Sequence, residues 1–513
     1  MRQKGIEATR QDQTSSRHNY FARKPSTMFP WRAVILINKA SGKPIYLQVV
    51  DSIIAEIHAG RLRPGQKLPG ARTLGELLGL NRKTIVAAMD ELNSQGWIES
   101  FVHKGTFVSS RIPSIAYQSL PGKELPGNQE TTAVQVNDPS WLETLYLDGS
   151  GKKMMDDGVP DVRLAPMQQL FAHHRSLLSK KAYLSLLKYN HVAGDLDLRT
   201  TLSTYLQETR GINSTPENIF LTRGSQMGIY LTLAALIKRG DSCFTTFPGY
   251  QIVDDMIKHL GGKVVHIPVD EEGLLTGSIE KICKKKKIKL LYATPHHHYP
   301  TTVTLSPDRR IELLRLASKY NFFILEDDYA YDFQYANNPV LPLASVNNNR
   351  VIYIGSFSKC ISPSVRTGYV VASGAVIKVV NKLRRIIDRQ GDPLLERALS
   401  EFIKSGDLQR HLKKVVKLSL HRRDYFCALL TKHLSGEISF VKPEGGMSVW
   451  IVFKKAKTAK GLLEKLCQAG YLIDSERVFL EKLHAIRIGF ASLTEKEMED
   501  FVGALRDAAQ GSP

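Results

Sequence analysis

The segment Ser356-Phe357-Ser358-Lys359 follows the apolar run of residues 351–355, and Arg366 lies seven residues after the lysine. A run rich in β-branched and aromatic residues that ends in glycine is typical of a buried strand entering a tight turn. A partly buried lysine can lose its proton near neutral pH and condense with an aldehyde, and hydroxyl groups beside an arginine suit a phosphate. Pyridoxal 5′-phosphate carries both groups, so the segment predicts a site for this cofactor. A surface Ser-Lys turn is the alternative for these residues alone.

An upstream segment supplies an acidic strand end. Residues 322–325 form a second buried-strand pattern, which leads to Asp327 and Tyr329. A carboxylate in this position can pair with the protonated pyridine nitrogen and keep the ring an electron sink. The tyrosine two residues later can reach the phenolic oxygen of the ring.

A third segment has the pattern of a phosphate cradle. Residues 219–222 form a strand that leads through Gly224, Ser225 and Gln226 into the helical pattern of residues 227–237. The free N–H groups and the dipole of a helix start favour a phosphate. The glycine turn alone is weak evidence, but the ordered set of cradle, acidic strand end and lysine turn is specific.

The chain has a domain organisation that resembles a known family. From about residue 151 to 513 it resembles fold-type I pyridoxal-phosphate aminotransferases, and residues 44–109 resemble the winged helix-turn-helix of GntR-type repressors. This order resembles the MocR/GabR class of transcription regulators. The resemblance implies an α+β winged helix-turn-helix domain, then an α/β fold-type I aminotransferase domain with a large mixed sheet flanked by helices and a small C-terminal α+β subdomain. Residues 1–43 are expected to form an arm, and residues 110–150 a linker.

The resemblance also implies roles for single residues. Lys359, Asp327 and Tyr329 would be the catalytic residues, and the last two would also hold the ring of the cofactor. Phosphate contacts would come from the cradle and the lysine turn, through Gly224, Ser225, Gln226, Ser356, Ser358 and Arg366.

Four further residues match positions of the family pattern. Tyr189 matches a tyrosine that reaches the phosphate of the partner subunit, with a packed core tyrosine as the alternative. Tyr250 matches the aromatic residue that lies against the cofactor, and His297 matches the recurring histidine of a Thr-Pro-x-His loop. Arg487 matches the clamp for an amino-acid carboxylate, a task that suits a bidentate guanidinium. The alternative for Arg487 is a surface arginine on a strand.

The expected substrate side departs from the family pattern. Ile252 stands where GABA-responsive members carry a second arginine, and Thr302 stands where the loop has glycine. The acidic residue expected before Phe247 is absent. The three histidines at 296–298 have no carboxylate or cysteine beside them, and adjacent residues do not readily converge on one ion, so we expect no metal site.

Length and composition agree with a multidomain protein of the cytoplasm. A chain of 513 residues exceeds one hydrophobic core. No apolar run approaches the length of a membrane span, and residues 1–20 are too polar for a secretory signal. The five cysteines lack metal or disulfide spacing, which fits a reducing compartment. The net charge of +20 favours a polyanionic partner. Residues 1–112 hold seventeen Lys and Arg against eight Asp and Glu, nearly half of that excess.

The N-terminal segment has the pattern of a DNA-binding domain. Helices are predicted over residues 45–59, 71–78 and 82–95, the last capped by Asn81, and two strands flank a turn at residues 103–105. A short helix, a tight turn, a capped helix and a wing place a helix N-terminus in the major groove. A small structural domain with a solvated basic face is the alternative. The expected DNA contacts are Arg72, Asn81, Arg82, Lys83, Thr84, His103 and Lys104.

These patterns predict a homodimeric regulator that binds operator DNA. Its pyridoxal-phosphate domain would sense an amino compound, held by Lys359 and Arg487, or the cofactor itself. An aminotransferase with an appended DNA-binding domain is the main rival, because all residues for Schiff-base chemistry are present.

Overall fold

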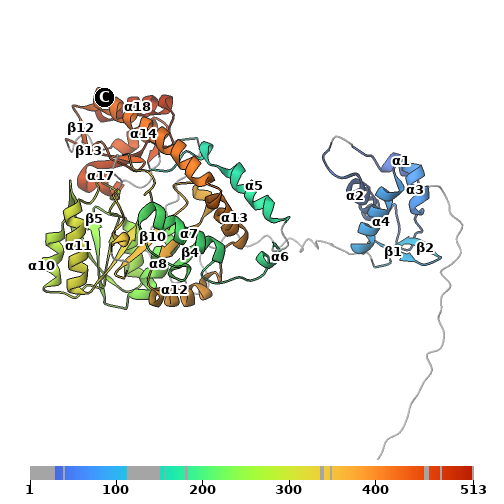
Figure 1. Ribbon diagram of the computed structural model, residues 1–513. Coiled ribbons are helices and arrows are strands. Elements are labelled where there is room, and N and C mark those ends of the chain that lie inside the picture. Colours follow the sequence, from blue (N-terminus) through green and yellow to red (C-terminus); the bar gives the residue numbers. More distant parts are fainter. Residues whose placement is uncertain are drawn as a thin grey trace, which may run out of the picture. The chain divides into compact units, whose positions relative to one another are not determined.

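The computed structural model describes residues 29–38, 41–111, 151–155, 158–179, 183–335, 340–346, 349–455, 461–473 and 477–510. The first 28 residues of the expected arm and residues 112–150 of the expected linker lie outside these ranges. The chain divides into two compact units, Met1–Asn137 and Asp138–Pro513 (Figure 1).

The first unit packs helices against a β-hairpin. Its elements are α1 (Trp31–Val34), α2 (Ile45–His58), α3 (Ala71–Leu78), α4 (Arg82–Ser94), β1 (Ile98–Phe101) and β2 (Gly105–Val108). The two strands pair antiparallel, with Ile98 opposite Val108. Apolar residues at helical spacing form one core, which Trp31 and Ile35 of the expected arm also join. The predicted helix-turn-helix and wing are confirmed, and α4 ends one residue before the predicted end.

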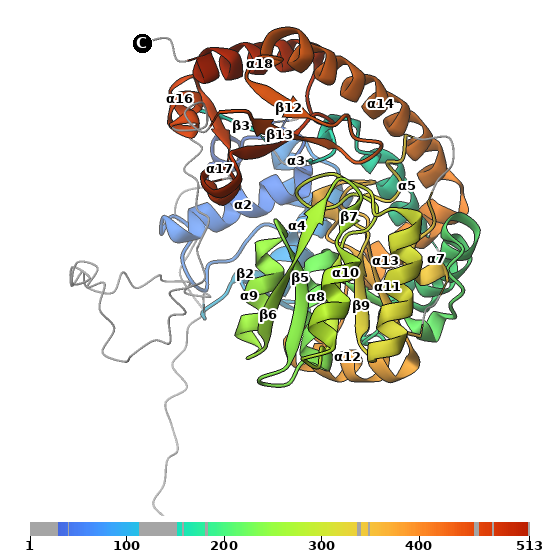
Figure 2. The same cartoon turned by 90° about the vertical axis from the view of Figure 1, so that its left-hand side faces the viewer.

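The second unit is built on an eight-stranded mixed sheet, as expected (Figure 2). Its order is β4 (Ile219–Thr222), β11 (Gly368–Val371), β10 (Val351–Ser356), β9 (Phe323–Asp327), β8 (Leu290–Ala293), β5 (Ser242–Phe247), β6 (Lys263–Asp270) and β7 (Gly273–Leu274). The strands from β10 to β6 are parallel, whereas β11 runs antiparallel to both β10 and β4. The carboxyl ends of β9 and β10, which carry the predicted site, therefore meet at one edge.

Helices cover both faces of this sheet. One core cluster joins the sheet to α8 (Gly224–Leu236), α9 (Gln251–His259) and α12 (Gly374–Ile387). The other cluster joins it to α5 (Met167–Leu177), α7 (Leu196–Arg210), α10 (Thr276–Cys283), α11 (Pro307–Tyr320) and α13 (Pro393–Lys404). Alternate residues of one strand serve the two clusters, since Phe220 lies in the first, and Ile219 and Leu221 lie in the second. Strands buried on both faces explain the nearly continuous apolar runs in the sequence.

The small C-terminal subdomain carries a second sheet of β12 (Ile438–Phe440), β13 (Ser448–Phe453) and β15 (Ala485–Gly489). Four helices pack with it: α14 (Asp407–Leu434), α16 (Leu462–Gln468), α17 (Arg477–Leu483) and α18 (Glu495–Gln510). Strand β13 begins at Ser448, because the preceding Gly445 and Gly446 form a turn in which Gly446 has a φ of +76°. Strand β3 (Lys153–Met155), which precedes the large sheet in the sequence, pairs in parallel with β14 (Tyr471–Ile473) of the small subdomain. In the part of the chain with described structure, no helix has the length and apolarity to cross a bilayer.

Candidate functional site

The lysine turn lies where β10 ends, between β9 and β11. Lys359 is partly buried, and its Nζ donates a hydrogen bond to the Gly158 carbonyl at 2.7 Å. Gly158 belongs to the first residues of the second unit and lies against Ser448 of the small subdomain. The lysine is thus enclosed between the large sheet and the small subdomain, so the surface-turn alternative is wrong.

Asp327 ends the neighbouring strand β9, opposite Ile354 of β10. Its Oδ2 accepts a hydrogen bond from the Tyr292 hydroxyl at 2.8 Å. Its Oδ1 is buried and accepts no hydrogen bond from any described residue. Burial raises the pKa of the Asp327 carboxyl to about 7, while the nearby Lys359 acts in the opposite direction. A buried carboxylate oxygen with no donor suits a protonated ring nitrogen, which would supply both a hydrogen bond and a positive charge.

The phosphate cradle is assembled from three elements. Helix α8 begins at Gly224, which has a φ of +78°. A Cβ on Gly224 would lie 2.8 Å from Arg366 Nη2, and one on Gly368 would lie 3.0 Å from the Ser225 amide nitrogen. These glycines therefore let the Arg366 guanidinium and strand β11 approach the free N–H groups of the helix start.

The serines complete the cradle. Ser356 ends β10, and its hydroxyl accepts a hydrogen bond from the Ser358 amide at 3.1 Å. Ser356 also pairs with Gly368, whose neighbours include Ser225. Arg366 donates to the Arg223 carbonyl at 2.9 Å and is otherwise exposed. The structure thus brings Gly224, Ser225, Ser356 and Arg366 together, and Gln226 lies in the same first turn of α8.

Arg487 connects the small subdomain to the loop after β8. It lies on β15 with 3% of its surface exposed, so the alternative of a surface arginine is wrong. Its Nη1 donates to the Pro300 carbonyl at 2.8 Å, and its Nη2 donates to the Tyr329 hydroxyl at 3.1 Å. Tyr329 in turn donates to the His297 carbonyl at 2.8 Å. The expected carboxylate clamp and the expected ring-hydroxyl contact are therefore direct neighbours.

His297 is buried where the same loop meets the small subdomain. Both of its ring nitrogens lack a hydrogen-bond partner among the described residues, and burial lowers its pKa to about 3. Its ring lies so close to Gly445 that a Cβ there would collide with it. The imidazole is thus neutral and packed on the glycine turn that precedes β13.

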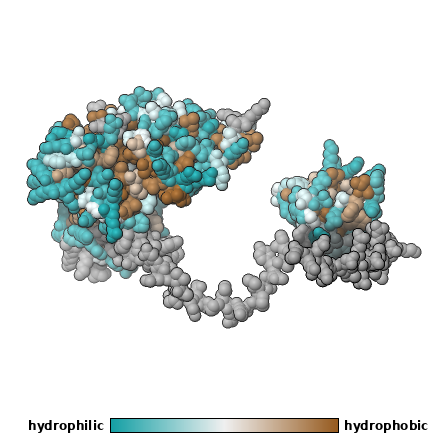
Figure 3. All heavy atoms as spheres, turned by 90° about the horizontal axis from the view of Figure 1, so that it is seen from below, coloured by the Kyte–Doolittle hydropathy of each residue, from teal (hydrophilic) through white to brown (hydrophobic). Residues whose placement is uncertain are grey.

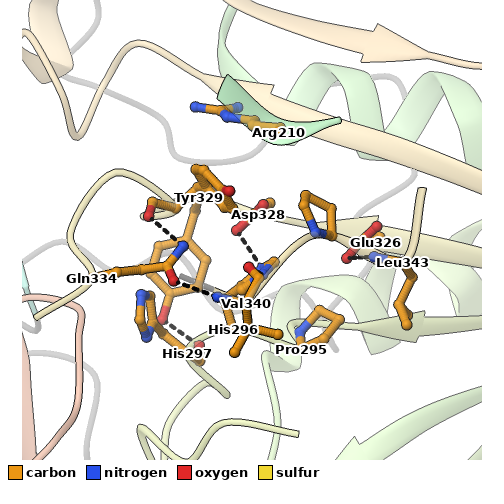
Figure 4. Close-up of polar contacts among 12 residues, drawn as sticks. Arg210, Pro295, His296, His297, Glu326, Asp328, Tyr329, Gln334, Val340 and Leu343 are labelled. Atoms are coloured by element: carbon orange, nitrogen blue, oxygen red, sulfur yellow. Dashed lines mark hydrogen bonds and ion pairs between the residues drawn. The ribbon is translucent and has the colours of Figure 1, made fainter. Parts of the chain in front are cut away.

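A second layer of polar groups lies behind these residues (Figure 4). His296 Nδ1 lies 3.1 Å from Asp328 Oδ1, and its Nε2 is 2.8 Å from the Val340 carbonyl. Glu326 accepts hydrogen bonds from the amides of Leu343 and Ala344, at 2.8 and 2.9 Å. These contacts hold the loop after β8 and the segment around residue 342 against the end of β9.

His298 holds the loop to a different strand. Its Nε2 is 3.0 Å from the Thr246 hydroxyl of β5, and its Nδ1 is 2.8 Å from the Thr301 hydroxyl. Burial lowers the pKa of His298 to about 3, so the ring is neutral. The three consecutive histidines face different partners and do not converge on one point. Thr302 adopts a φ of +65°, the left-handed conformation that the family glycine would take.

The two predicted cofactor-binding tyrosines, Tyr250 and Tyr189, differ in position, since Tyr250 lies near Arg487 and Tyr189 is exposed. Tyr250 precedes α9, and its ring centroid lies 5.3 Å from that of Tyr299, whose ring is also 5.0 Å from the Arg487 guanidinium. Tyr250 is thus on the same side as the clamp. Tyr189 is 77% exposed, with the Arg389 guanidinium 3.9 Å from its ring centroid. The alternative of a packed core tyrosine is therefore wrong.

The expected DNA contacts form an exposed surface of the first unit. Arg82 and Lys83 are exposed in the first turn of α4, and Thr84 beside them is half-buried. Asn81 caps this helix, because its Oδ1 accepts from the Lys83 amide at 2.9 Å. Arg72 is exposed and lies 3.2 Å from Glu76.

The wing supplies the remaining contacts of this surface. His103 and Lys104 are exposed in the turn between β1 and β2, and His103 has a φ of +62°. Gly70 precedes α3 and makes no side-chain cap.

Sequence reasoning missed Tyr292 and the buried layer behind the site. Tyr292 lies on β8, in register with Leu325 of β9, and this pairing places its hydroxyl on Asp327. The available signal was a hydroxyl group within an otherwise apolar strand. The contacts of His296 with Asp328 and of His298 with Thr246 carry no such signal, because these partners lie 32 and 52 residues away in the sequence.

Comparison with protein families divides the chain as the structure does. The model for aminotransferase class I and II matches residues 159–505, and the model for bacterial regulatory proteins of the gntR family matches residues 45–108.

Known proteins resemble the chain over one or both units. The probable rhizopine catabolism regulatory protein MocR of Rhizobium meliloti is 25% identical over 93% of this chain and 96% of its own. The pyridoxine biosynthesis transcriptional regulator PdxR of Corynebacterium glutamicum is 27% identical over 76% of this chain and 79% of its own. A crystal structure of Pyrococcus horikoshii kynurenine aminotransferase in complex with PMP matches 70% of this chain and 91% of its own, with 26% identity and a TM-score of 0.66.

Proposed function

We propose that this chain, which belongs to the class I and II aminotransferase family and is a MocR-type helix-turn-helix transcriptional regulator, binds pyridoxal 5′-phosphate. We further propose that it senses an amino compound. Operator DNA would bind to residues 44–109, and the effector to residues 151–513. The observation that carries the proposal is the Oδ1 atom of Asp327. This atom is buried near Lys359 and accepts no hydrogen bond from any described residue.

Different residues of the second unit would bind the ring and the phosphate of this cofactor. Asp327 would pair with the ring nitrogen, and Tyr250 would lie against the ring. The helix start at Ser225, together with Ser356 and Arg366, would hold the phosphate. When bound, the cofactor supplies an aldehyde carbon, and a primary amine can replace the amino group of Lys359 in its bond to this carbon.

Effector recognition would centre on Arg487. It donates hydrogen bonds to Pro300 and Tyr329, which belong to the large-sheet part of the unit. A carboxylate that paired with the guanidinium would compete with these groups, because a carboxylate is the stronger acceptor. Effector binding would thereby change how the small subdomain is held, which is the kind of differential contact a sensor requires.

Exposed apolar residues support a homodimer. The segment 162–196 has many of them, and these are Val162, Leu164, Phe171, Leu178, Leu184, Leu187, Tyr189 and Leu196. Hydrophobic residues are visible on the surface of the larger unit (Figure 3). A monomeric soluble protein rarely leaves so many apolar side chains of one segment in water. Tyr189 would then be available to a partner subunit.

Borohydride reduction tests the cofactor assignment. Reduction of the purified holoprotein should fix the cofactor covalently on Lys359, which peptide mass spectrometry would locate. Lys359→Ala should abolish the adduct, and Lys378→Ala on the exposed face of α12 should not. The same adduct in Lys359→Ala protein would refute the assignment.

The rival enzyme function is tested by steady-state turnover. The expected substrate side has Ile252, Thr302 and Thr246 in place of the family pattern, so we expect transamination orders of magnitude below a typical turnover of about ten per second. A panel of amino and keto acids decides the point. Turnover of about one per second or faster for any pair would favour an aminotransferase.

Cofactor sensing is a second candidate, favoured by the isoleucine at position 252 and by the similarity to PdxR. Operator binding measured with and without added pyridoxal 5′-phosphate, in the absence of any amino compound, separates the two. A response to the cofactor alone would support this candidate.

A further inference from the structure

The exposed face of α4 carries two apolar residues between its cations and an acid. Arg82 and Lys83 are exposed in the first turn, Val86 and Ala87 in the second, and Asp90 in the third. Val86 is 38% exposed, although the opposite face of the same helix is fully packed into the core. Residues four apart on a helix are neighbours, so these five side chains form one continuous stripe.

The positive charge of the first unit indicates that the partner of this stripe is a polyanion. Residues 1–112 hold seventeen Lys and Arg against eight Asp and Glu. Neither Arg82 nor Lys83 forms an ion pair with another residue of the described ranges, so both cations are available to a polyanion. Asp90 would repel a phosphate, which limits close contact with DNA to the first two turns of the helix. The N-terminal turns of a recognition helix are the ones that reach base edges in the major groove.

Phosphate binding does not account for Val86 and Ala87, since neither can donate a hydrogen bond. The major groove offers one apolar group, the C5-methyl of thymine. We propose that Val86 and Ala87 read thymine methyl groups in the operator. This inference rests on the DNA-binding function and adds to it the base class that this helix selects.

Helix geometry places the thymine relative to the contacts of the first turn. Val86 follows Arg82 by four residues, which is about 6 Å along the helix axis. The rise of DNA is about 3.4 Å per base pair, so the two side chains reach positions at most about two base pairs apart. Arginine pairs with the O6 and N7 atoms of guanine. The operator half-site would therefore contain a thymine within about two base pairs of a guanine.

Replacement of thymine by deoxyuridine removes only the methyl group and tests the proposal. The full-length holoprotein would first select its site from a pool of random-sequence duplexes. Each thymine of the selected site would then be replaced singly, and affinity measured at one salt concentration. Loss of one buried methyl group should weaken binding by about four-fold at one or two positions.

Protein variants connect the penalty to α4. Val86→Ala should remove the deoxyuridine penalty at one position, whereas Val86→Thr, which keeps a branched methyl group, should retain it. Val102→Ala is the matched control, because Val102 is 82% exposed on the wing of the same unit. Tolerance of deoxyuridine at every position, or an undiminished penalty in both Val86→Ala and Ala87→Ser, would overturn the proposal. Failure to select any sequence, with no salt-dependent binding, would refute the DNA-binding function instead.

Discussion

The two candidate sites of this chain differ in how their residues are brought together. The DNA-contact surface uses near neighbours in sequence, Asn81 to Thr84 and the turn at His103, and most of these side chains are exposed. The cofactor site draws on β4, β9, β10, β11 and β15, and its central groups are buried. A surface built from short exposed segments can vary without loss of the fold. A buried site built from five strands cannot, because each residue is also part of the packing.

Burial also sets the electrostatics of the second site. The pKa of Asp327 is raised to about 7, and that of His298 is lowered to about 3, in both cases chiefly by loss of water. Substitutions should therefore affect stability and binding together in the second unit, and binding alone on the surface of the first.

The largest effect is expected for Gly368→Ala. A Cβ at this position would lie 2.8 Å from the Gly224 carbonyl carbon and 3.0 Å from the Ser225 amide, and neither backbone group can move without loss of the cradle. Overpacking of this kind costs about 1–3 kcal/mol. We expect lower thermal stability together with a loss of pyridoxal-phosphate affinity, measured by titration of the apoprotein. Gly374→Ala is the control, since nothing lies within 4 Å of its Cβ, and it should change neither.

Substitutions in α4 should weaken DNA binding without loss of stability. Arg82→Ala should cost about 1–3 kcal/mol of operator affinity and relax selectivity at one position. Lys83→Ala should lower the slope of log affinity against log salt by about one. Both are measured by fluorescence anisotropy over a salt series, with unfolding as the control. Unchanged binding in Arg82→Ala, Lys83→Ala and Lys104→Ala would contradict the placement of the recognition helix.

A smaller, pH-dependent effect is expected for His298→Asn. Burial lowers the pKa of His298 in the folded protein from its ordinary value of 6.5 to about 3, so the buried neutral ring contributes stability that is present above pH 6.5 and lost as the pH falls toward 3. The side chain of asparagine does not bind a proton in this pH range. The stability gap between wild type and the variant should therefore narrow below pH 6.5, by at most about 1.4 kcal/mol per pH unit.

Urea unfolding of the full chain at several pH values between 4 and 7 measures this gap. A constant gap for His298→Asn would show that the ring is not the buried neutral group seen in the structure.

Local sequence patterns predicted the helices and strands of both units. In the second unit they also predicted the order along the chain of the phosphate cradle, the acidic strand end and the lysine turn. Strand β4 has the predicted bounds, and Gly224, Asp327 and Lys359 lie where strand ends placed them. These features follow from apolar runs and turn residues, which are properties of short segments. The contact of Tyr292 with Asp327 was not predictable, because it depends on the register between β8 and β9.

The same reason explains the alternatives that sequence left open. Burial of Arg487 and exposure of Tyr189 depend on the packing of whole elements, so the flanking residues could not decide between them. Thr302 shows a third case. Its backbone has the left-handed conformation that glycine adopts readily, and the hydrogen bonds of Thr302 to His298, and of His298 to Val303, hold the loop in it.

The smallest effect is expected for Gly70→Ser, in the first unit. Gly70 precedes α3 with φ −63° and ψ 157°, a backbone conformation that suits an N-cap, and it makes no side-chain cap. Nothing lies within 4 Å of its Cβ, so a serine hydroxyl can accept a hydrogen bond from the first turn. The gain over glycine should be only a few tenths of a kcal/mol. Amide exchange of Thr73 should slow by roughly two-fold, since it is a predicted donor to the cap. Gly79→Ser, where φ is +68°, should instead destabilise the same helix by about 1 kcal/mol, and equal effects of the two serines would contradict the capping argument.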